Sequence, residues 1–334
     1  MGWMCNSAAA TCGSRGSAPS LRCAICKWCR NSPSISTSPG GEGDESVDNG
    51  PTGGLTWDGR VDRHRDQARL PLLSPFEMAN DSPAAVVARV RKATYAREAR
   101  KTFGDAVFND AGEAFATVVA ALEAYQQDAE QLYPYSSRYD AYLAGRALLT
   151  PQQMRGLALF NDPQKGNCAS CHRSRRGNDG TPPQFTDYGL IAIAVPRNRD
   201  IPANADPSFY DLGACGPLRT DLSGRSEYCG LFRTPTLRNV ALRGSFFHNG
   251  AVHTLREAVE FYVERDTRPE KWYRRAGEGR VRKYDDLPPQ YHANINIEPP
   301  FGIRAGNTPA LSAAEIDDVV AFLGTLTDGD LPNR

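Results

Sequence analysis

Apolar residues recur at helical spacing in several stretches of the chain after residue 54. Residues 83–101 and 111–132 both match a helical pattern, and the pattern of 111–132 places its apolar side chains on one stripe. Further helices are predicted over 151–160, over 254–264 and after Ser312. The stripe of 111–132 consists of Phe115, Val118, Val119, Leu122 and Tyr125, and that of the last helix consists of Ile316, Val319, Val320, Leu323 and Leu326.

Two of the predicted helices begin with the same polar signature. Thr150 can accept a hydrogen bond from the backbone of Gln153 while the Gln153 side chain reaches back, which makes a capping box. Pro151 suits the first turn of that helix because its fixed φ is already helical. Ser312 and Glu315 repeat the capping box near the end of the chain. The first of the two signatures predicts that a second domain starts at residue 149.

These patterns divide the chain into three segments. Residues 1–53 are rich in Ser, Gly, Asn and Asp and follow neither the helical nor the strand period, which is a disordered composition. Residues 54–148 carry the first helices, and residues 149–334 form the second domain, where 173–310 is mostly loop. Because the chain also contains 30 Gly and 24 Pro, we expect a mainly α-helical fold with long loops and little sheet.

Charge and hydropathy exclude two classes of partner. The chain has 39 Lys and Arg against 39 Asp and Glu, so its net charge gives no electrostatic footprint for nucleic acid. No apolar run approaches the length of a membrane span, which needs about 18 residues or more. The first thirty residues also lack the continuous apolar region of a signal peptide.

Nine cysteines fall in clusters, and one cluster has a specific meaning. Cys168, Cys171 and His172 form a CxxCH sequence, which is the attachment signature of c-type haem. The two thiols become thioethers to the porphyrin, and the histidine supplies the proximal nitrogen to iron. A zinc half-site or a redox CxxC is the alternative, but neither a second ligand pair nor a βαβ context is visible. The sequence therefore predicts a haem c in residues 149–334.

The residues alone leave the sixth iron ligand open. The four methionines lie at positions 1, 4, 78 and 154, so none follows the haem motif. The remaining candidates are His248, His253, His292 and Tyr262, each of which could instead be a buried side chain with a satisfied polar group.

Cys215 and Cys229 lie fourteen residues apart in a Gly-rich loop. In an oxidising compartment they would form a disulfide that stabilises the loop by about 3 kcal/mol on a chain-entropy argument.

A set of short motifs between residues 55 and 332 resembles the bacterial di-haem cytochrome c peroxidase family, which includes the MauG-like proteins. The resemblance implies two cytochrome c-like helical domains, each with one haem c, and a calcium ion between them. It also implies hydrogen peroxide as a substrate and is compatible with a homodimer. The motifs are Trp57-Asp58-Gly59-Arg60, Gln67, Pro75-Phe76-Glu77-Met78, Arg155-Gly156-Leu157-Ala158-Leu159-Phe160, Thr234-Pro235-Thr236-Leu237-Arg238-Asn239, and Phe247-His248-Asn249-Gly250 with Thr254-Leu255.

The resemblance assigns catalytic roles to three residues of the first domain. By position, Glu77 is similar to the acid/base that moves a proton between the peroxide oxygens, and Gln67 to its polar neighbour. Such a carboxylate suits the chemistry because cleavage of the O–O bond needs a proton moved from one oxygen to the other. Trp57 is similar to the aromatic residue between the two haems, an electron relay. Without the resemblance, an exposed glutamate and a core tryptophan would be the ordinary interpretations.

The resemblance also singles out Tyr262. This position corresponds to the one where many family peroxidases carry the methionine ligand of the second haem, and tyrosine there is the MauG-like variant. A methionine-ligated haem readily accepts an electron from a small cytochrome, whereas a tyrosine-ligated haem favours oxidation of a protein substrate. The partner implied is therefore a small electron-donor protein such as a c-type cytochrome, or a protein substrate.

The N-terminal segment departs from the family pattern. The family has a CxxCH before the Trp57 motif, but this chain has no histidine before His64. It has Cys23-Ala24-Ile25-Cys26-Lys27 instead, so a lysine-ligated first haem is one interpretation, and a wrongly read gene start is the simpler one. We expect an incomplete N-terminal domain, with a mono-haem electron carrier as the third functional hypothesis. Covalent haem attachment predicts a periplasmic protein although no signal peptide is visible.

Overall fold

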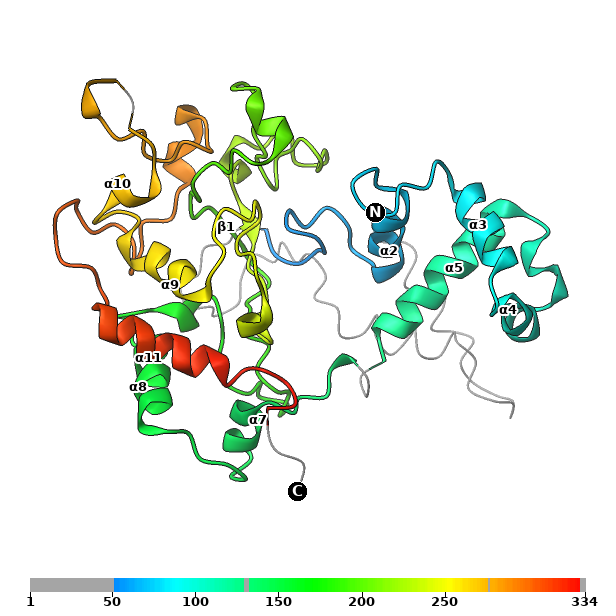
Figure 1. Cartoon of the computed structure of the whole chain (residues 1–334), viewed down its shortest axis with the longest axis horizontal. Helices are drawn as coiled ribbons and strands as arrows, with labels where there is room; N and C mark the ends of the chain where they lie inside the picture. The colour runs from blue at the N-terminus through cyan, green and yellow to red at the C-terminus, as the bar shows by residue number, and fades with distance from the viewer. Residues whose placement is uncertain (1–50, 129–131, 276, 331–334) are drawn as a thin grey trace, which may run out of the picture. The chain divides into compact units, whose positions relative to one another are not determined.

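Two crossing helices lie at the centre of residues 149–334 in the computed structural model, which describes residues 51–128, 132–275 and 277–330. Helix α8 (Pro151–Asn161) packs against α11 (Ala313–Gly324), as all three ribbon views show (Figure 1). Both helices begin with the predicted capping boxes, Thr150 with Gln153 and Ser312 with Glu315. The sequence signals at these two helix starts are confirmed.

A glycine permits the close approach of the two helices. A Cβ atom on Gly156 would lie 1.9 Å from the backbone oxygen of Asp318. Beside it, the Arg155 guanidinium donates two hydrogen bonds, of 2.8 and 2.9 Å, to the Asp318 carboxylate. The Arg155-Gly156 pair therefore fixes how α8 sits on α11.

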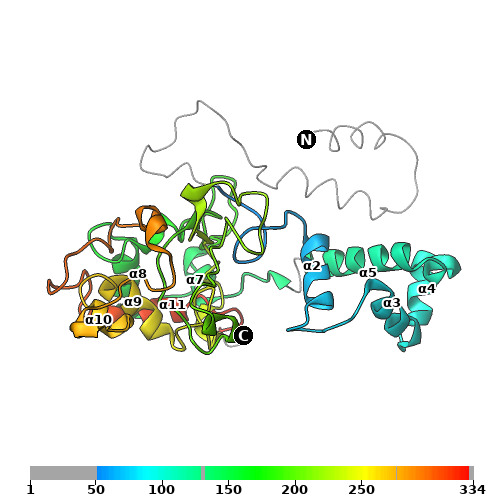
Figure 2. The ribbon, with the colours of Figure 1, turned by 90° about the horizontal axis from the view of Figure 1, so that it is seen from above.

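Four helices before residue 127 build a separate hydrophobic core. They are α2 (His64–Leu73), α3 (Pro83–Lys92), α4 (Ala96–Phe103) and α5 (Ala111–Gln126), with a 3-10 turn η1 (Asp105–Phe108) between the last two (Figure 2). The buried side chains of this core are Leu72, Val86, Val87, Ala96, Phe108, Ala114, Phe115 and Val119.

The helix predictions in this region need two corrections. The stretch 83–101 is two helices, because the backbone turns extended at Ala93 and lets Val87 of α3 and Ala96 of α4 bury in the same core. Helix α5 ends at Gln126, and residues 129–131 of the predicted helix lie outside the described residues. Tyr125, expected on the apolar stripe, is 55% exposed because it lies in the last turn beyond the core.

The predicted loop-rich region between 173 and 310 is confirmed. Its only regular sheet among the described residues pairs β1 (Leu190–Ile191) antiparallel with β2 (Phe232–Arg233). Helix α9 (Leu255–Glu264) begins with Thr254 as its N-cap, as predicted, and α10 (Pro269–Trp272) is a single turn. The 3-10 turns of the C-terminal region are Cys168–Ser170, Pro202–Ala205, Ser226–Tyr228, Val240–Leu242, Gly277–Gly279 and Pro289–Asn294.

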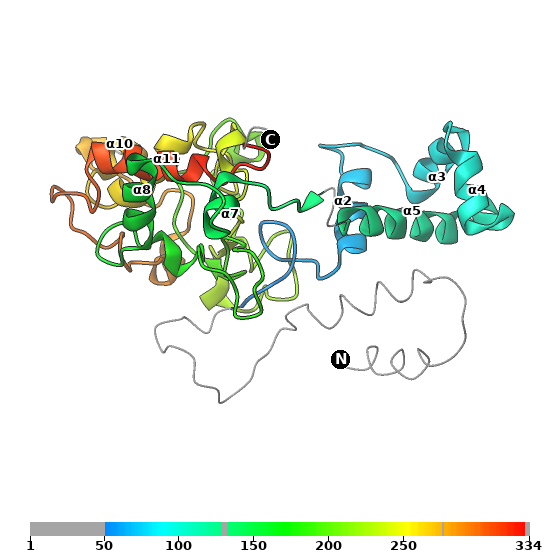
Figure 3. The same ribbon diagram turned by 90° about the horizontal axis from the view of Figure 1, so that it is seen from below.

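Helices α8 and α11 lie against each other (Figure 3), and an aromatic cluster is part of the core in which both pack. Phe160 of α8 lies 5.2 Å from Phe322 of α11 between ring centroids, and Phe185 lies 6.2 Å from Phe160. Tyr139 of α7 (Arg138–Leu143) completes the cluster and donates from its hydroxyl to the Ser174 carbonyl at 3.0 Å. The core around the haem motif therefore includes a residue that precedes position 149. The predicted mainly α-helical fold is confirmed.

The described residues from 51 to 330 belong to one structural unit. The five cysteines at positions 5–29 and Lys27 lie outside the described residues, so the first-haem interpretations stay predictions. None of the helices in the described part of the chain has the length and apolar character that crossing a membrane requires.

Candidate haem-binding site

The CxxCH sequence folds into a tight turn directly after α8. Asn167 enters the turn with a φ of 46°, and its side-chain amide donates to the Pro299 carbonyl at 2.7 Å. Cys168 begins the 3-10 turn, and its carbonyl accepts from the backbone N–H of His172 at 2.8 Å. This bond closes the turn, so the two thiols and the imidazole come from one rigid loop.

The imidazole of His172 is buried and already oriented. Its Nδ1 lies 2.9 Å from the Phe185 carbonyl oxygen, which can only accept, so Nδ1 carries the proton and Nε2 keeps a free lone pair. Burial lowers the pKa of His172, although the backbone of Phe185 and of Pro235 opposes that effect. A neutral imidazole with a free Nε2 is the form that binds iron.

The segment that carries the Phe185 carbonyl is held by the Thr234–Asn239 motif. Arg238 donates from Nε to the Pro183 carbonyl at 2.9 Å, and the Thr236 hydroxyl donates to the Gln184 carbonyl at 2.6 Å. Arg238 also forms a buried bidentate pair with Asp140, with both N–O distances 2.9 Å. We assigned no role to Arg238 or Asp140 from the sequence. The Thr234–Asn239 motif, which contains Arg238, was the available signal that this segment matters.

The two thiols have the chemistry that haem attachment needs. Cys168 and Cys171 are unpaired and partly buried. Burial raises the pKa of the Cys168 thiol to about 12 and raises that of Cys171 as well, so both are protonated at neutral pH. Zinc and redox sites need thiolates beside positive charge or further ligands, and the described residues hold no cluster of three His, Cys, Asp or Glu that could bind a metal. These features fit a haem c and not a zinc site.

Tyr262 of α9 lies near these thiols. Burial raises the pKa of Tyr262, and the nearby Cys171 and Cys168 raise it further. Its ring stacks on Phe301 at 5.5 Å and tilts against Phe247 at 6.0 Å between centroids. None of the hydrogen bonds among the described residues involves its hydroxyl. A partly buried phenol near both haem cysteines fits the expected role of Tyr262 as the second iron ligand.

The three histidine candidates fit that role less well. His253 is exposed. His292 uses Nε2 to contact the Leu287 carbonyl at 2.9 Å. His248 stacks face to face on Phe232 at 3.5 Å between centroids, and burial alone lowers its pKa to about 3. The neighbouring haem cysteines therefore favour Tyr262 over these histidines.

Trp57 is anchored to the C-terminal region and is not the core tryptophan that its sequence alone would suggest. Its indole Nε1 donates to the Asp211 carboxylate at 2.9 Å, and its carbonyl accepts from the Arg233 backbone at 2.7 Å. The guanidinium of Arg60 lies 4.7 Å from the centre of the indole ring. Trp57 is 39% exposed, so part of its side chain reaches the protein surface.

Gln67 and Glu77 lie in and just after α2. Gln67, with His64 and Gln126, lines a cavity of about 280 Å³. Glu77 is exposed on the turn that follows the helix, where its backbone N–H donates to the Ser74 carbonyl at 3.1 Å. It does not line the cavity that Gln67 lines. The structure therefore does not bring Glu77 and Gln67 into one cavity, and their catalytic roles stay predictions.

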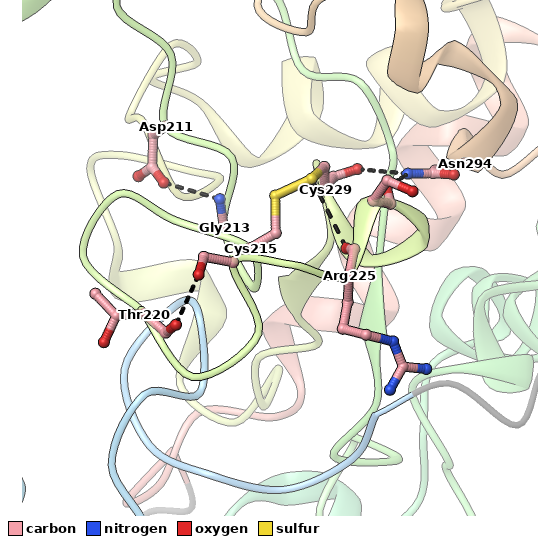
Figure 4. The surroundings of a disulfide bond; sticks show 9 residues. Asp211, Gly213, Cys215, Thr220, Arg225, Cys229 and Asn294 are labelled. Carbon is pink, nitrogen blue, oxygen red and sulfur yellow. Dashed lines mark hydrogen bonds between the residues drawn. A yellow bond between two sulfur atoms is a disulfide. The ribbon is translucent and has the colours of Figure 1, made fainter.

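The predicted disulfide between Cys215 and Cys229 is present (Figure 4). It closes the loop that begins at Asp211. The Asn294 side chain donates to the Cys229 carbonyl at 3.0 Å and ties the loop to a distant turn.

Comparison with known proteins agrees with these features. Residues 9–148 match the model of the di-haem cytochrome c peroxidase family. The chain is 32% identical over 280 residues to the methylamine utilization protein MauG of Paracoccus denitrificans, covering 83% of this chain and 68% of that protein. It is 29% identical to the cytochrome c551 peroxidase of Nitrosomonas europaea, covering 61% of this chain and 52% of that protein. The crystal structure of the diheme peroxidase BthA from Burkholderia thailandensis superposes with a TM-score of 0.74 at 43% identity, covering 84% of this chain and 67% of that one.

Proposed function

The chain belongs to the di-haem cytochrome c peroxidase family, which includes the MauG proteins, and from this premise we propose that it reduces hydrogen peroxide with electrons from a small redox protein. Membership makes it a haem-dependent oxidoreductase. The observation that carries the proposal is the prepared haem site, where His172 keeps Nε2 free because Nδ1 donates to the Phe185 carbonyl at 2.9 Å.

Four residues would hold the haem of the C-terminal region. Cys168 and Cys171 would form the thioethers, His172 Nε2 would be the proximal ligand and the Tyr262 hydroxyl the distal one. A haem bound there would supply one-electron redox chemistry. The chain's own contribution is a set of partly or fully buried groups next to an apolar core. The aromatic cluster of Phe160, Phe185 and Phe322 keeps water away, and the Thr234–Asn239 motif holds the carbonyl that orients His172.

Residues 54–128 would provide the proton chemistry. Glu77 would take a proton from one peroxide oxygen and deliver it to the other, and Gln67 would orient the peroxide by a hydrogen bond. Trp57 would pass electrons between this pocket and the C-terminal haem. The anchoring of Trp57 at both its backbone carbonyl and its indole nitrogen supports the relay role, because a fixed ring keeps the transfer distance constant.

A second function has an observation in its favour. Tyr262 would be the MauG-like variant of the distal ligand, and its side chain lies near both haem cysteines. A phenolate stabilises oxidised iron, which favours oxidation of residues on a partner protein over acceptance of electrons from a cytochrome. The identity of 32% with the Paracoccus denitrificans MauG is in keeping with this alternative.

Four further predictions accompany the function. We place the protein in the periplasm, because c-type haem attachment occurs outside the cytoplasm and the Cys215–Cys229 disulfide suits an oxidising compartment. The division into 54–148 and 149–334 stays a prediction. The two separate cores support two domains, but Tyr139 packs in the C-terminal core although it precedes residue 149. A calcium ion and a homodimer stay predictions of the family.

The deciding experiment combines a haem count with turnover. The chain is matured in a host that attaches haem c, haem per chain is measured by pyridine haemochrome, and peroxide-dependent oxidation of a reduced c-type cytochrome is followed. We expect covalent haem and turnover. One haem per chain without turnover would remove the peroxidase function and leave the electron carrier. Peroxide-dependent modification of a partner protein without cytochrome oxidation would favour the MauG-like alternative.

A further inference from the structure

The carboxylate beside Trp57 has no part in the roles described so far. Asp211 accepts the indole Nε1–H of Trp57 on Oδ2 at 2.9 Å and the backbone N–H of Gly213 on Oδ1 at 2.9 Å. Both of its oxygens therefore have fixed donors, and the carboxylate points at the one ionisable proton of the indole. A charge-assisted hydrogen bond of this kind is stronger and shorter than a neutral one.

The loop behind Asp211 is braced, so the carboxylate holds its position. The Cys215–Cys229 disulfide closes the loop (Figure 4), and Leu212 accepts from the Gly230 backbone at 2.8 Å. On the other side, the Trp57 carbonyl accepts from the Arg233 backbone at 2.7 Å. The indole and the carboxylate are thus held by two separate anchors, and neither has to move for a proton to pass between them.

A cation faces the ring of Trp57. The Arg60 guanidinium lies 4.7 Å from the ring centre and shares its charge with Asp58 through two bonds of 2.9 Å. Loss of an electron alone would place a positive indole against this guanidinium, which Coulomb repulsion opposes. Loss of the Nε1 proton in the same event leaves a neutral ring and removes the repulsion.

We propose that Asp211 accepts the Nε1 proton of Trp57 when the indole loses an electron, so that Trp57 relays electrons as a neutral radical. In this step the Nε1–H bond breaks, an O–H bond forms on Asp211 Oδ2, and the electron passes to the peroxide-derived oxidant. The reverse step returns one electron to the ring and the proton to Nε1. The inference rests on the relay role proposed for Trp57, and Asp211 acts as a positioning residue and proton acceptor for it.

The surroundings of Asp211 suit a proton acceptor. Burial raises the pKa of Asp211, and nearby Asp58 raises it further, while Gly213, Trp57 and Arg60 oppose that shift. Because its pKa is raised, the carboxylate is a stronger base than one in water. Protonation of Asp211 in acid would remove the acceptor, so the rate of Trp57 oxidation should fall as the pH falls through the pKa of Asp211.

Flash photo-oxidation of the haem-loaded full chain with soluble ruthenium(III) tris-bipyridine tests the pairing without relying on turnover. The exposed edge of Trp57 is open to this oxidant, and the transient signal that Trp57→Phe removes belongs to that ring. We expect a neutral tryptophanyl radical in the wild type. In Asp211→Asn, whose single amide oxygen can accept only one of the two hydrogen bonds and cannot take up the Nε1 proton, we expect a cation radical and an oxidation rate lower on the order of 100-fold. Asp221→Asn is the matched control, because Asp221 lies in the same loop, pairs with Arg219 and does not contact Trp57.

An unchanged neutral radical at an unchanged rate in Asp211→Asn would overturn the inference. If that variant folds poorly, the pH dependence of the Trp57 oxidation rate in the wild type is the test. A rate that does not fall in acid would contradict Asp211 as the proton acceptor. Peroxide turnover separates this inference from the relay role. Turnover that Trp57→Phe leaves unchanged would overturn the relay and the inference together, whereas loss of turnover in Trp57→Phe with a normal Asp211→Asn radical would overturn the inference alone.

Discussion

In the family, two regions of the chain each bind a haem. In this structure, these two regions differ in how many of the expected site residues lie close together. In the C-terminal region, the Cys168–His172 turn, the Phe185 carbonyl and Tyr262 come from three distant segments and meet in one buried place. In residues 54–128, Gln67 lines a small cavity and Glu77 is exposed to solvent. The first region carries the groups that we propose bind haem, whereas the second carries the proposed acid/base residue without a CxxCH motif among its described residues.

This difference shows that a structure marks candidate site residues when they are buried or hydrogen-bonded, and not when they are exposed. Burial desolvates the two thiols, the imidazole and the phenol of the C-terminal region. A shifted pKa or a fixed hydrogen-bond partner marks each of them as a candidate functional group. Glu77 has neither a buried environment nor a partner that would mark it. Its role depends on a haem that faces it, so the structure of the chain alone does not display that role.

The largest effect we expect comes from the haem cysteines. Cys168→Ala with Cys171→Ala should abolish covalent haem in the C-terminal region, because both thioether donors are lost. The check is a haem stain after denaturing electrophoresis together with pyridine haemochrome. The matched control is Cys215→Ser with Cys229→Ser, which removes the disulfide but should keep the haem. Equal haem in both double variants would break the contrast between the two cysteine pairs.

Glu77→Gln should have the next largest effect. We expect peroxide turnover to fall by about 10²–10⁴-fold, because the amide cannot carry the proton between the peroxide oxygens. Haem content and spectrum should not change. Glu98→Gln, an exposed carboxylate of α4, is the control. Full activity in Glu77→Gln would mean that residues 54–128 contribute no acid/base group at this position, and it would favour the electron carrier.

Asp140→Asn tests whether the C-terminal region depends on its buried ion pair. Leaving the Arg238 guanidinium unpaired should cost about 3–5 kcal/mol in the free energy of unfolding. Burial raises the pKa of Asp140, but the hydrogen bonds from Arg238 and Ser137 lower it by more. Because the folded pKa is depressed, this stabilisation is present at neutral pH and is lost as the pH falls through the folded value.

Urea unfolding at pH 7 and in the acid range measures both parts of that prediction. Wild-type stability should fall more steeply in acid than that of Asp140→Asn. Asp330→Asn, which breaks the exposed pair with Arg138, should cost less than about 1 kcal/mol. Similar losses in the two variants would contradict the assigned role of Asp140 and Arg238.

The smallest effect concerns the crossing of α8 and α11. Gly156→Ala should destabilise the C-terminal region by about 1–3 kcal/mol, because the new methyl group meets the Asp318 carbonyl and the helices must move apart. Thermal unfolding gives the measurement. Gly324→Ala, where a Cβ would meet no atom within 4 Å, should show no comparable loss. A neutral Gly156→Ala would show that the two helices can separate without cost.

Local chemistry explains which features the sequence could predict. The capping boxes at Thr150 and Ser312, the loop character of 173–310 and the Cys215–Cys229 disulfide depend on neighbouring residues or on residue type, and all are present. The break between α3 and α4 was missed because it serves a tertiary contact, the shared burial of Val87 and Ala96.

The site divides along the same line. The CxxCH motif is local and could be read directly from the sequence. Arg238 and the Pro183 carbonyl are 55 positions apart in the sequence, and Asp211 and Trp57 are 154 positions apart. Neither periodicity nor motif spacing predicts hydrogen bonds between residues so far apart.

The ligation of iron by His172 and Tyr262 is the central claim, and Tyr262→Phe tests it most directly. The chain is loaded with haem, and visible and electron paramagnetic resonance spectra of the ferric protein are recorded. Tyr273→Phe serves as control, since the Tyr273 hydroxyl donates to the Ala194 carbonyl and is not a candidate ligand. We predict unchanged covalent haem in both variants, with loss of the low-spin signal of the C-terminal haem in Tyr262→Phe only. An unchanged low-spin spectrum in Tyr262→Phe would contradict the account.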